Sequence, residues 1–293
     1  MFQGSIVALV TPMCPDGAID WPAYDRLLDF HLEQGTDGLV INGTTGESVV
    51  LSAEESVELV ARAKRRIAGR VPVIAGSGSN CTRRTVDLSR AMQNAGADAL
   101  LVVTPYYNKP TQEGLFRHFS VVADAVSIPV ILYNVPSRTA VDLLPDTAVR
   151  LAAHERIVAI KEATGIISRA REILSAAGPD FAVLSGDDPT VVDLMEAGAV
   201  GVISVTGNVA PNAMHEICRL ALSGDFEGAR KLDATLRKLH KSLFLESNPI
   251  PVKWAVAQIG LIGAGIRLPL TPLAERFHEP LRQAMAEAGV TFA

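Results

Sequence analysis

Short apolar runs alternate with longer amphipathic stretches along the chain as far as Val205. Eight of the runs have the length of strands buried on both faces. They are Ser5–Val10, Gly38–Asn42, Val71–Ala75, Ala99–Val103, Val130–Tyr133, Ile157–Ile160, Ala182–Leu184 and Val200–Val205. The stretches between them, such as Ala53–Ala68, Thr82–Ala95 and Gly114–Ala125, are long enough for crossover helices. This alternation predicts parallel βαβ units.

The number of units decides between two α/β folds. About eight units close a (β/α)8 TIM barrel, whereas a doubly wound sheet usually has fewer and needs a Gly-rich turn after its first strand. The first run here ends in Thr11-Pro12 instead. A chain of 293 residues that is 48% hydrophobic can bury the core of such a barrel. We therefore expect a TIM barrel.

Only helices are predicted after Val205. The helical stretches are Asn212–Leu222, Phe226–Phe244, Pro251–Gly260 and Leu273–Ala288. One final barrel unit needs fewer helices than these. We therefore predict a barrel that carries the catalytic site over residues 1–224 and a C-terminal helical appendage over residues 225–293.

Composition and charge argue against several classes of function. The net charge is −5 with no basic stripe, so we expect no nucleic-acid partner. No run reaches membrane-spanning length and no signal peptide is evident, which favours a cytoplasmic protein without a membrane partner. Cys14, Cys81 and Cys218 show neither disulfide nor zinc spacing, and the six histidines are dispersed. We expect no metal and no cofactor.

Lys161 follows the apolar run Ile157–Ile160, and a lysine is rarely buried without a partner. Burial lowers the pKa of an amine and frees it to attack a carbonyl and form a Schiff base. The alternative is a strand-end lysine that reaches water or pairs with Glu162. This stretch by itself leaves both interpretations open.

Polar side chains cluster where the predicted strands end, which is the edge of a TIM barrel that carries active sites. Three of the four tyrosines are among them. The residues are Thr44 and Thr45, Tyr106 and Tyr107, Tyr133 and Asn134, Lys161, Gly186 and Asp187, and Ser204. This convergence favours a catalytic Lys161.

The segment Gly43–Glu47 (Gly-Thr-Thr-Gly-Glu) lies between a strand and a helix. Its glycines allow backbone N–H groups and threonine hydroxyls to converge on an anion such as a carboxylate. Ser52 and Glu55 form a capping-box pattern at the start of the following helix. A tight turn that caps this helix is an equally good interpretation.

Tyr133 and Arg138 are the other two candidates. Tyr133 precedes Lys161 by one βα unit, so the two are expected at the same level of neighbouring strands, where a phenol can move protons for a carbinolamine. A buried structural tyrosine is the alternative. Arg138 lies in a proline-containing loop and could bind a carboxylate with two hydrogen bonds, or it could pair with Asp142.

These motifs, with Ser185–Asp188 and Glu246–Lys253, make the whole chain resemble the dihydrodipicolinate synthase family of the pyruvate-dependent class I aldolase and lyase superfamily. The resemblance implies that Lys161 forms a Schiff base with pyruvate and that the enamine attacks aspartate semialdehyde, a step of diaminopimelate and lysine biosynthesis. It also implies a homotetramer built as a dimer of dimers.

Residue roles are implied by the same resemblance. Tyr133, Thr44 and Tyr107 would form a proton relay, with Tyr107 contributed by the adjacent subunit. Thr45 and Thr44 would hold the pyruvate carboxylate, and Arg138 would hold the carboxylate of the second substrate. Backbone atoms of Gly186 and Ile203 would line the pocket.

The sequence departs from the family pattern at a regulatory site. Feedback-inhibited members bind lysine through residues kept here as Ser48, Asn80 and Tyr106. They also use histidine or acidic residues at positions that are Ala53, Ser56 and Arg84 here. A guanidinium in place of a carboxylate repels the lysine ammonium, so we expect weak or no inhibition by lysine. Ala140, where glycine is common, is a minor departure.

Three other functions compete with this interpretation. A sister enzyme could use Lys161 on a sugar acid or a 2-oxo acid. A carboxylate-binding protein could have kept the barrel without catalysis. A pyridoxal phosphate enzyme is the least favoured, because no phosphate-binding cluster is evident at the last two strands.

Overall fold

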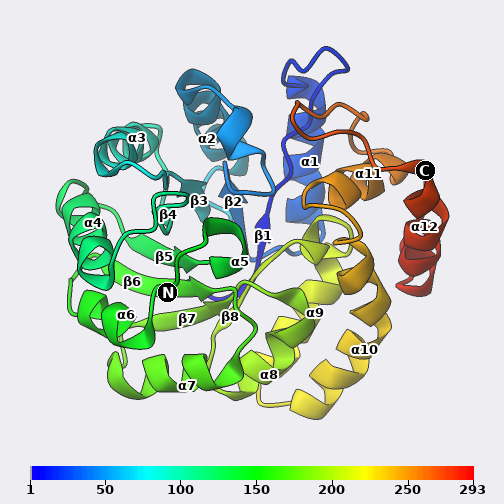
Figure 1. The fold of residues 1–293 in the computed structure, drawn as a ribbon. Helices are drawn as coiled ribbons and strands as arrows, with labels where there is room; N and C mark the ends of the chain where they lie inside the picture. The colour runs from blue at the N-terminus through cyan, green and yellow to red at the C-terminus, as the bar shows by residue number, and fades with distance from the viewer. Residues whose placement is uncertain (1) are drawn as a thin grey trace.

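Eight parallel strands close into a barrel surrounded by helices (Figure 1). The computed structural model describes residues 2–293. The strands pair in chain order and β1 closes the barrel against β8. They are β1 (Gly4–Ala8), β2 (Gly38–Ile41), β3 (Val73–Gly76), β4 (Ala99–Val103), β5 (Val130–Asn134), β6 (Ile157–Glu162), β7 (Ala182–Ser185) and β8 (Gly201–Ser204). The predicted TIM barrel is confirmed.

The β6 strand is longer than predicted. The apolar run was expected to stop before Lys161, but β6 continues to Glu162. The reason is the ladder with β5, in which Tyr133 is opposite Lys161 and Asn134 is opposite Glu162. Backbone pairing therefore extends two residues past the last apolar side chain.

Helices follow the strands as crossovers. They are α1 (Trp21–Glu33), α2 (Ala53–Ile67), α3 (Thr82–Asn94), α4 (Gln112–Asp124), α6 (Pro145–Ala152), α7 (Ile167–Ala176), α8 (Val191–Glu196) and α9 (Pro211–Leu222). The α2 helix begins at the predicted capping box of Ser52 and Glu55. The α4 helix begins two residues earlier than predicted, because the Thr111 hydroxyl caps it by accepting a hydrogen bond from the N–H of Gly114.

Shorter helical segments connect some of these elements. The proline-containing loop that carries Arg138 forms the helical turn α5 (Pro136–Thr139). Single 3-10 turns are η1 (Ser48–Val50), η2 (Asp188–Thr190), η3 (Thr206–Asn208) and η4 (Glu275–Phe277).

The chain after Ser223 is helical. It forms α10 (Phe226–Ser242), α11 (Ile250–Gln258) and α12 (His278–Glu287), and α10 packs between α9 and α12. The α12 helix starts later than predicted, because η4 occupies the residues before it. Asp225 caps α10, while the division of the chain into two regions at this residue stays a prediction. Within residues 2–293, no helix is both long and apolar enough to cross a membrane.

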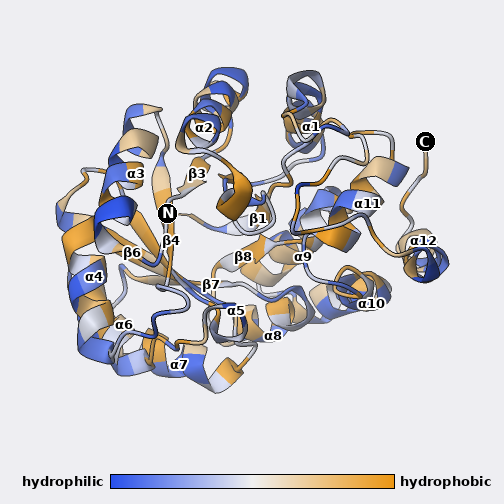
Figure 2. Cartoon of the chain, turned by 45° about the horizontal axis from the view of Figure 1, so that its top comes forward, coloured by the Kyte–Doolittle hydropathy of each residue, from blue (hydrophilic) through white to orange (hydrophobic). Residues whose placement is uncertain are grey.

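Each strand buries both faces. One set of side chains, including Ile6, Ile74 and Ile131, fills the interior of the barrel, and the alternate set packs beneath the helices. Figure 2 shows mostly hydrophobic strands and hydrophilic residues on the outer faces of the helices. The alternation decides which side chains of a strand can reach the interior.

Gly76 supports the segment that leads into the Gly43–Glu47 loop. A Cβ at Gly76 would collide with the carbonyl oxygen of Asn42, whose side-chain amide donates to the Gly76 carbonyl at 2.7 Å. Asn42 is buried and has a left-handed backbone with φ 60°. No side chain can therefore be added at Gly76 without displacing the end of β2.

We expect Gly76→Ala to lower the free energy of unfolding by about 1 to 3 kcal/mol, the cost of overpacking a core. Gly263→Ala is the matched control, because its Cβ would lie 3.7 Å from the Met13 carbonyl oxygen, an ordinary contact. Thermal midpoints of the two variants measure the difference. Equal midpoints would contradict the packing assigned to Gly76.

Candidate active site

Lys161 points into the barrel. Lys161 is two residues after Ala159, whose side chain is in the barrel interior, so the two face the same way along β6. Ile160 between them packs under the helices. Its side chain is buried, at 5% exposure, and Nζ lies 4.3 Å from the centre of the Tyr133 ring. The predicted position of the two residues at one level of neighbouring strands is confirmed by their direct pairing. An amine and a phenol therefore share the interior of the barrel.

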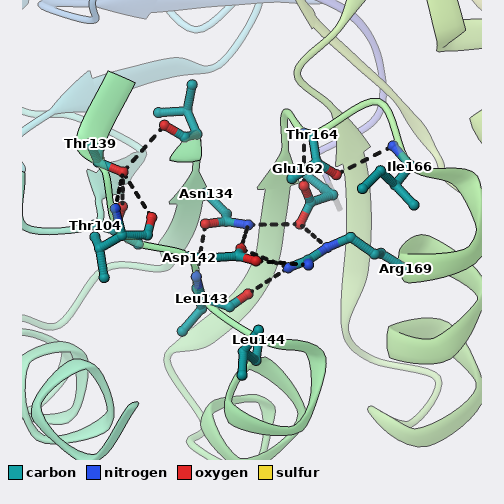
Figure 3. A network of polar contacts seen from close by, with 12 residues as sticks. Thr104, Asn134, Thr139, Asp142, Leu143, Leu144, Glu162, Thr164, Ile166 and Arg169 are labelled. Carbon is teal, nitrogen blue, oxygen red and sulfur yellow. Dashed lines mark hydrogen bonds and ion pairs between the residues drawn. The ribbon is translucent and has the colours of Figure 1, made fainter. Parts of the chain in front are cut away.

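Glu162 occupies the opposite face of β6 and does not pair with Lys161. Its carboxylate accepts hydrogen bonds from the Asn134 amide at 3.2 Å and from the Thr164 backbone at 2.9 Å, and it lies 3.7 Å from Arg169 Nε (Figure 3). Within residues 2–293, no carboxylate lies within ion-pair distance of Lys161. The alternative that paired Lys161 with Glu162 is wrong, because adjacent strand residues face opposite ways.

Asp142 pairs with Arg169 and not with Arg138. Its two carboxylate oxygens accept from the Arg169 guanidinium at 2.9 and 3.0 Å, and one of them also accepts from Asn134 at 2.9 Å. Figure 3 shows these side chains converging between β5, β6 and α7. The alternative pairing of Arg138 with Asp142 is therefore wrong. The network joins the ends of β5 and β6 from outside the barrel.

The Gly43–Glu47 loop is a tight turn that also leaves donors free. The N–H groups of Gly46 and Ser48 donate to the Gly43 carbonyl at 3.1 and 3.3 Å, and Glu47 N–H donates to the Thr44 carbonyl at 3.1 Å. In the described chain, the backbone N–H groups of Thr44 and Thr45 have no partner. The loop is therefore a tight turn as one interpretation had it, although α2 is capped by Ser52 and not by the loop, and the binding of an anion stays a prediction.

A cavity of about 480 Å³ adjoins Thr44 and Tyr133, while Lys161 and Thr45 are not among its lining residues. Its lining includes Thr44 and Ser48 from the segment after β2, Tyr106 from the segment after β4, and Tyr133 from β5. Asn80 does not line it, and its carbonyl accepts from the Asn108 amide instead. The cavity is large enough for a small organic acid.

Gly186 leaves space for the lysine. A Cβ at Gly186 would come within 3.0 Å of Lys161 Cε and 2.6 Å of Ala163 Cβ. Ile203 is 1% exposed and belongs to the interior set of side chains. Gly186 therefore lies beside Lys161, and Ile203 lies in the barrel interior.

Arg138 and Tyr107 are exposed. The Tyr107 side chain is 87% exposed and its backbone is left-handed, with φ 75°. Arg138 lies on α5 and its guanidinium donates to the Asn248 carbonyl oxygen at 3.3 Å. Within one chain, the phenol of Tyr107 is thus directed to solvent and does not join the buried residues.

Comparison with known proteins agrees over the whole chain. The model of the dihydrodipicolinate synthetase family matches residues 1–288. The chain belongs to this family. It is 57% identical over 290 residues to the 4-hydroxy-tetrahydrodipicolinate synthase of Ectopseudomonas mendocina. The aligned residues are 99% of this chain and 99% of that protein.

Solved structures of family members have the same fold. One is the chloride-inhibited dihydrodipicolinate synthase of Acinetobacter baumannii complexed with pyruvate, with 53% identity, a TM-score of 0.98 and coverage of 99% of this chain and 100% of that chain. Another is the synthase of Aquifex aeolicus, with 46% identity, a TM-score of 0.97 and coverage of 99% of each chain.

Other polar groups at the strand ends in this family member have structural partners. Ser204 Oγ accepts from Gly207 N–H at 2.8 Å, and Asp187 accepts from the Thr190 hydroxyl at 2.7 Å. Burial raises the pKa of Asp187. Across residues 2–293, no three His, Cys, Asp or Glu side chains are grouped so that they could hold a metal ion.

The partners of the candidate residues are not predicted by the sequence. Asn248 donates to the Thr45 hydroxyl at 3.0 Å, and Lys253 forms a buried ion pair with Glu47. For the outer network, the sequence offers one sign. Asn134 and Glu162 are polar residues at the ends of two otherwise apolar strands, and the strands pair so that the two residues are opposite each other. The contacts of Asn248 and Lys253 join segments about 200 residues apart, which local patterns do not reveal.

Proposed function

We propose that this chain condenses pyruvate with L-aspartate 4-semialdehyde in diaminopimelate and lysine biosynthesis. The observation that carries the proposal is the buried amine of Lys161, which has no carboxylate partner within residues 2–293 and lies against the Tyr133 ring. The names of the full-length relatives and the pyruvate bound to the Acinetobacter enzyme support it. The chain is then a lyase-type synthase.

The chemistry follows from the amine. Lys161 adds to the ketone carbon of pyruvate, and the carbinolamine loses water to form an imine. Loss of a proton from the methyl carbon gives an enamine, whose carbon bonds to the aldehyde carbon of the second substrate. Tyr133, with Thr44 and Tyr107, is proposed to carry protons between these steps, because a phenol adjoins the amine.

Two carboxylate subsites are proposed. Thr44 and Thr45 hold the carboxylate of pyruvate, supported by their free backbone N–H groups in the described chain. Arg138 holds the carboxylate of aspartate semialdehyde, supported by its exposure beside the strand ends. The backbones of Gly186 and Ile203 are proposed to line the pocket.

We also propose a homotetramer arranged as a dimer of dimers in the cytoplasm. The exposure of Tyr107 supports an interface, because a relay tyrosine at the surface of one chain needs a second copy to direct it into a pocket. The free thiols of Cys14, Cys81 and Cys218 fit a reducing compartment.

Incubation with pyruvate followed by borohydride is expected to leave a reduced adduct on Lys161, located by peptide mass mapping. Lys161→Ala should lose both the adduct and the activity. Lys231→Ala, at an exposed position on α10, should keep both. A folded wild-type protein without an adduct would overturn the proposed function, and activity retained by Lys161→Ala would favour a role without the Schiff base.

Arg138→Ala is expected to raise the KM for aspartate semialdehyde by about tenfold or more, the worth of a charge-assisted hydrogen bond. The KM for pyruvate should change little. Arg117→Ala serves as the control, because Arg117 makes an exposed ion pair with Glu113 on α4. Steady-state kinetics with each substrate varied will show the difference. A greater effect on pyruvate, or better turnover of a sugar aldehyde, would contradict the assigned subsite.

We expect lysine to inhibit weakly or not at all at about 1 mM. Arg84 lines the same cavity as Ser48, Tyr106, Ala53 and Ser56, and its guanidinium repels the ammonium of lysine. Arg84→Glu should increase the sensitivity to lysine in an inhibition titration. Strong inhibition of the wild-type protein below this concentration would refute the expectation.

A further inference from the structure

The side chain of Asn248 holds the hydroxyl of Thr45. Asn248 lies between α10 and α11, and its Nδ2 donates to Thr45 Oγ1 at 3.0 Å. Both side chains are buried, at 5% exposure for Asn248 and 2% for Thr45. A contact so far from water is little disturbed by solvent.

The direction of this hydrogen bond matters. A hydroxyl has one hydrogen to donate and two lone pairs. In this orientation of the amide Thr45 Oγ1 accepts, so its own hydrogen stays available for another acceptor, while Asn248 Oδ1 is buried without a partner within residues 2–293. The N–H groups of Thr44 and Thr45 are also free within residues 2–293. The loop therefore presents three donors, which suit a carboxylate.

The C-terminal region holds the loop at its other end as well. Lys253 on α11 forms a buried ion pair with Glu47, the last residue of the loop. The second carboxylate oxygen of Glu47 accepts from the Arg267 backbone N–H at 3.2 Å. Glu47 has a left-handed backbone with φ 60°, which this pairing maintains. Both Thr45 and Glu47 of the loop therefore contact the segment that carries Asn248 and Lys253.

Asn248 also contacts the second carboxylate subsite through its backbone. Its carbonyl oxygen accepts from the Arg138 guanidinium at 3.3 Å. The side chain thus acts on Thr45 and the main chain on Arg138. A substitution that shortens the side chain removes the first contact and keeps the second.

We propose that Asn248 is a positioning residue that orients the Thr45 hydroxyl as a donor to the keto-acid carboxylate, while its carbonyl oxygen directs Arg138. The inference rests on the proposed function and extends it to the region after the barrel. It assigns to residues 246–253 a part in substrate binding. The amide has no contact with the reacting atoms.

Asn248→Asp tests the orientation, because aspartate has nearly the same shape but accepts where the amide donates. The Thr45 hydroxyl would then donate to Asp and be lost to pyruvate. We expect the pyruvate concentration that gives half-maximal borohydride-trapped adduct on Lys161 to rise about tenfold or more. Asn212→Asp, exposed in the first turn of α9, is the control and should not change it.

Asn248→Ala separates this role from a structural one. It should raise the KM for pyruvate and leave the KM for aspartate semialdehyde within about twofold, since the backbone carbonyl remains. In a Thr45→Val background, which has no hydroxyl to orient, Asn248→Ala should add less than about a twofold further loss. Additive effects, or equal effects on both substrates, would overturn the positioning role.

The two proposals fail in different ways. A folded wild-type protein that gives no adduct on Lys161 refutes the proposed function. An adduct in the wild type with the same half-saturation in Asn248→Ala refutes only the role of Asn248. If Asn248→Asp does not fold, as judged by circular dichroism, the comparison of Asn248→Ala in the wild type with Asn248→Ala in the Thr45→Val background tests the role of Asn248.

Discussion

The backbone ladder between β5 and β6 is the constraint on which the site depends. It sets Tyr133 opposite Lys161 inside the barrel and Asn134 opposite Glu162 outside it. Because side chains alternate along a strand, one register fixes both pairs. A slip of one residue would bring a carboxylate into the interior and move the amine under the helices. The same hydrogen bonds therefore set the amine and the phenol side by side inside the barrel and direct the Glu162 carboxylate away from them.

Charge is separated across the wall of the barrel. Outside, the carboxylates of Asp142 and Glu162 lie near the guanidinium of Arg169 and accept from Asn134. Inside, the amine of Lys161 has the face of Tyr133 as its neighbour. Removing one partner from the outer network would leave a buried charge uncompensated, which is costly. The outer network thus keeps the two strand ends together, and none of its carboxylates pairs with the lysine.

The loop between β2 and α2 is shaped locally but held from a distance. Its turn comes from hydrogen bonds among neighbouring residues of Gly43–Glu47. Its orientation comes from Asn248 and Lys253, which belong to the helical region after the barrel. That region is therefore in contact with the candidate site as well as with the outside of the barrel. A truncation after α9 would remove these contacts to the loop as well as the helices.

The amino-acid sequence by itself determined the order and type of the elements, because periodicity and capping are properties of neighbouring residues. It placed the eight strands and set Tyr133 level with Lys161. Only the tertiary structure decided that Asp142 binds Arg169, that Tyr107 faces solvent and that Asn248 meets Thr45. These contacts depend on how the barrel closes and how the last helices return to it. Closure joins residues far apart along the chain, and no local pattern records which of them will meet.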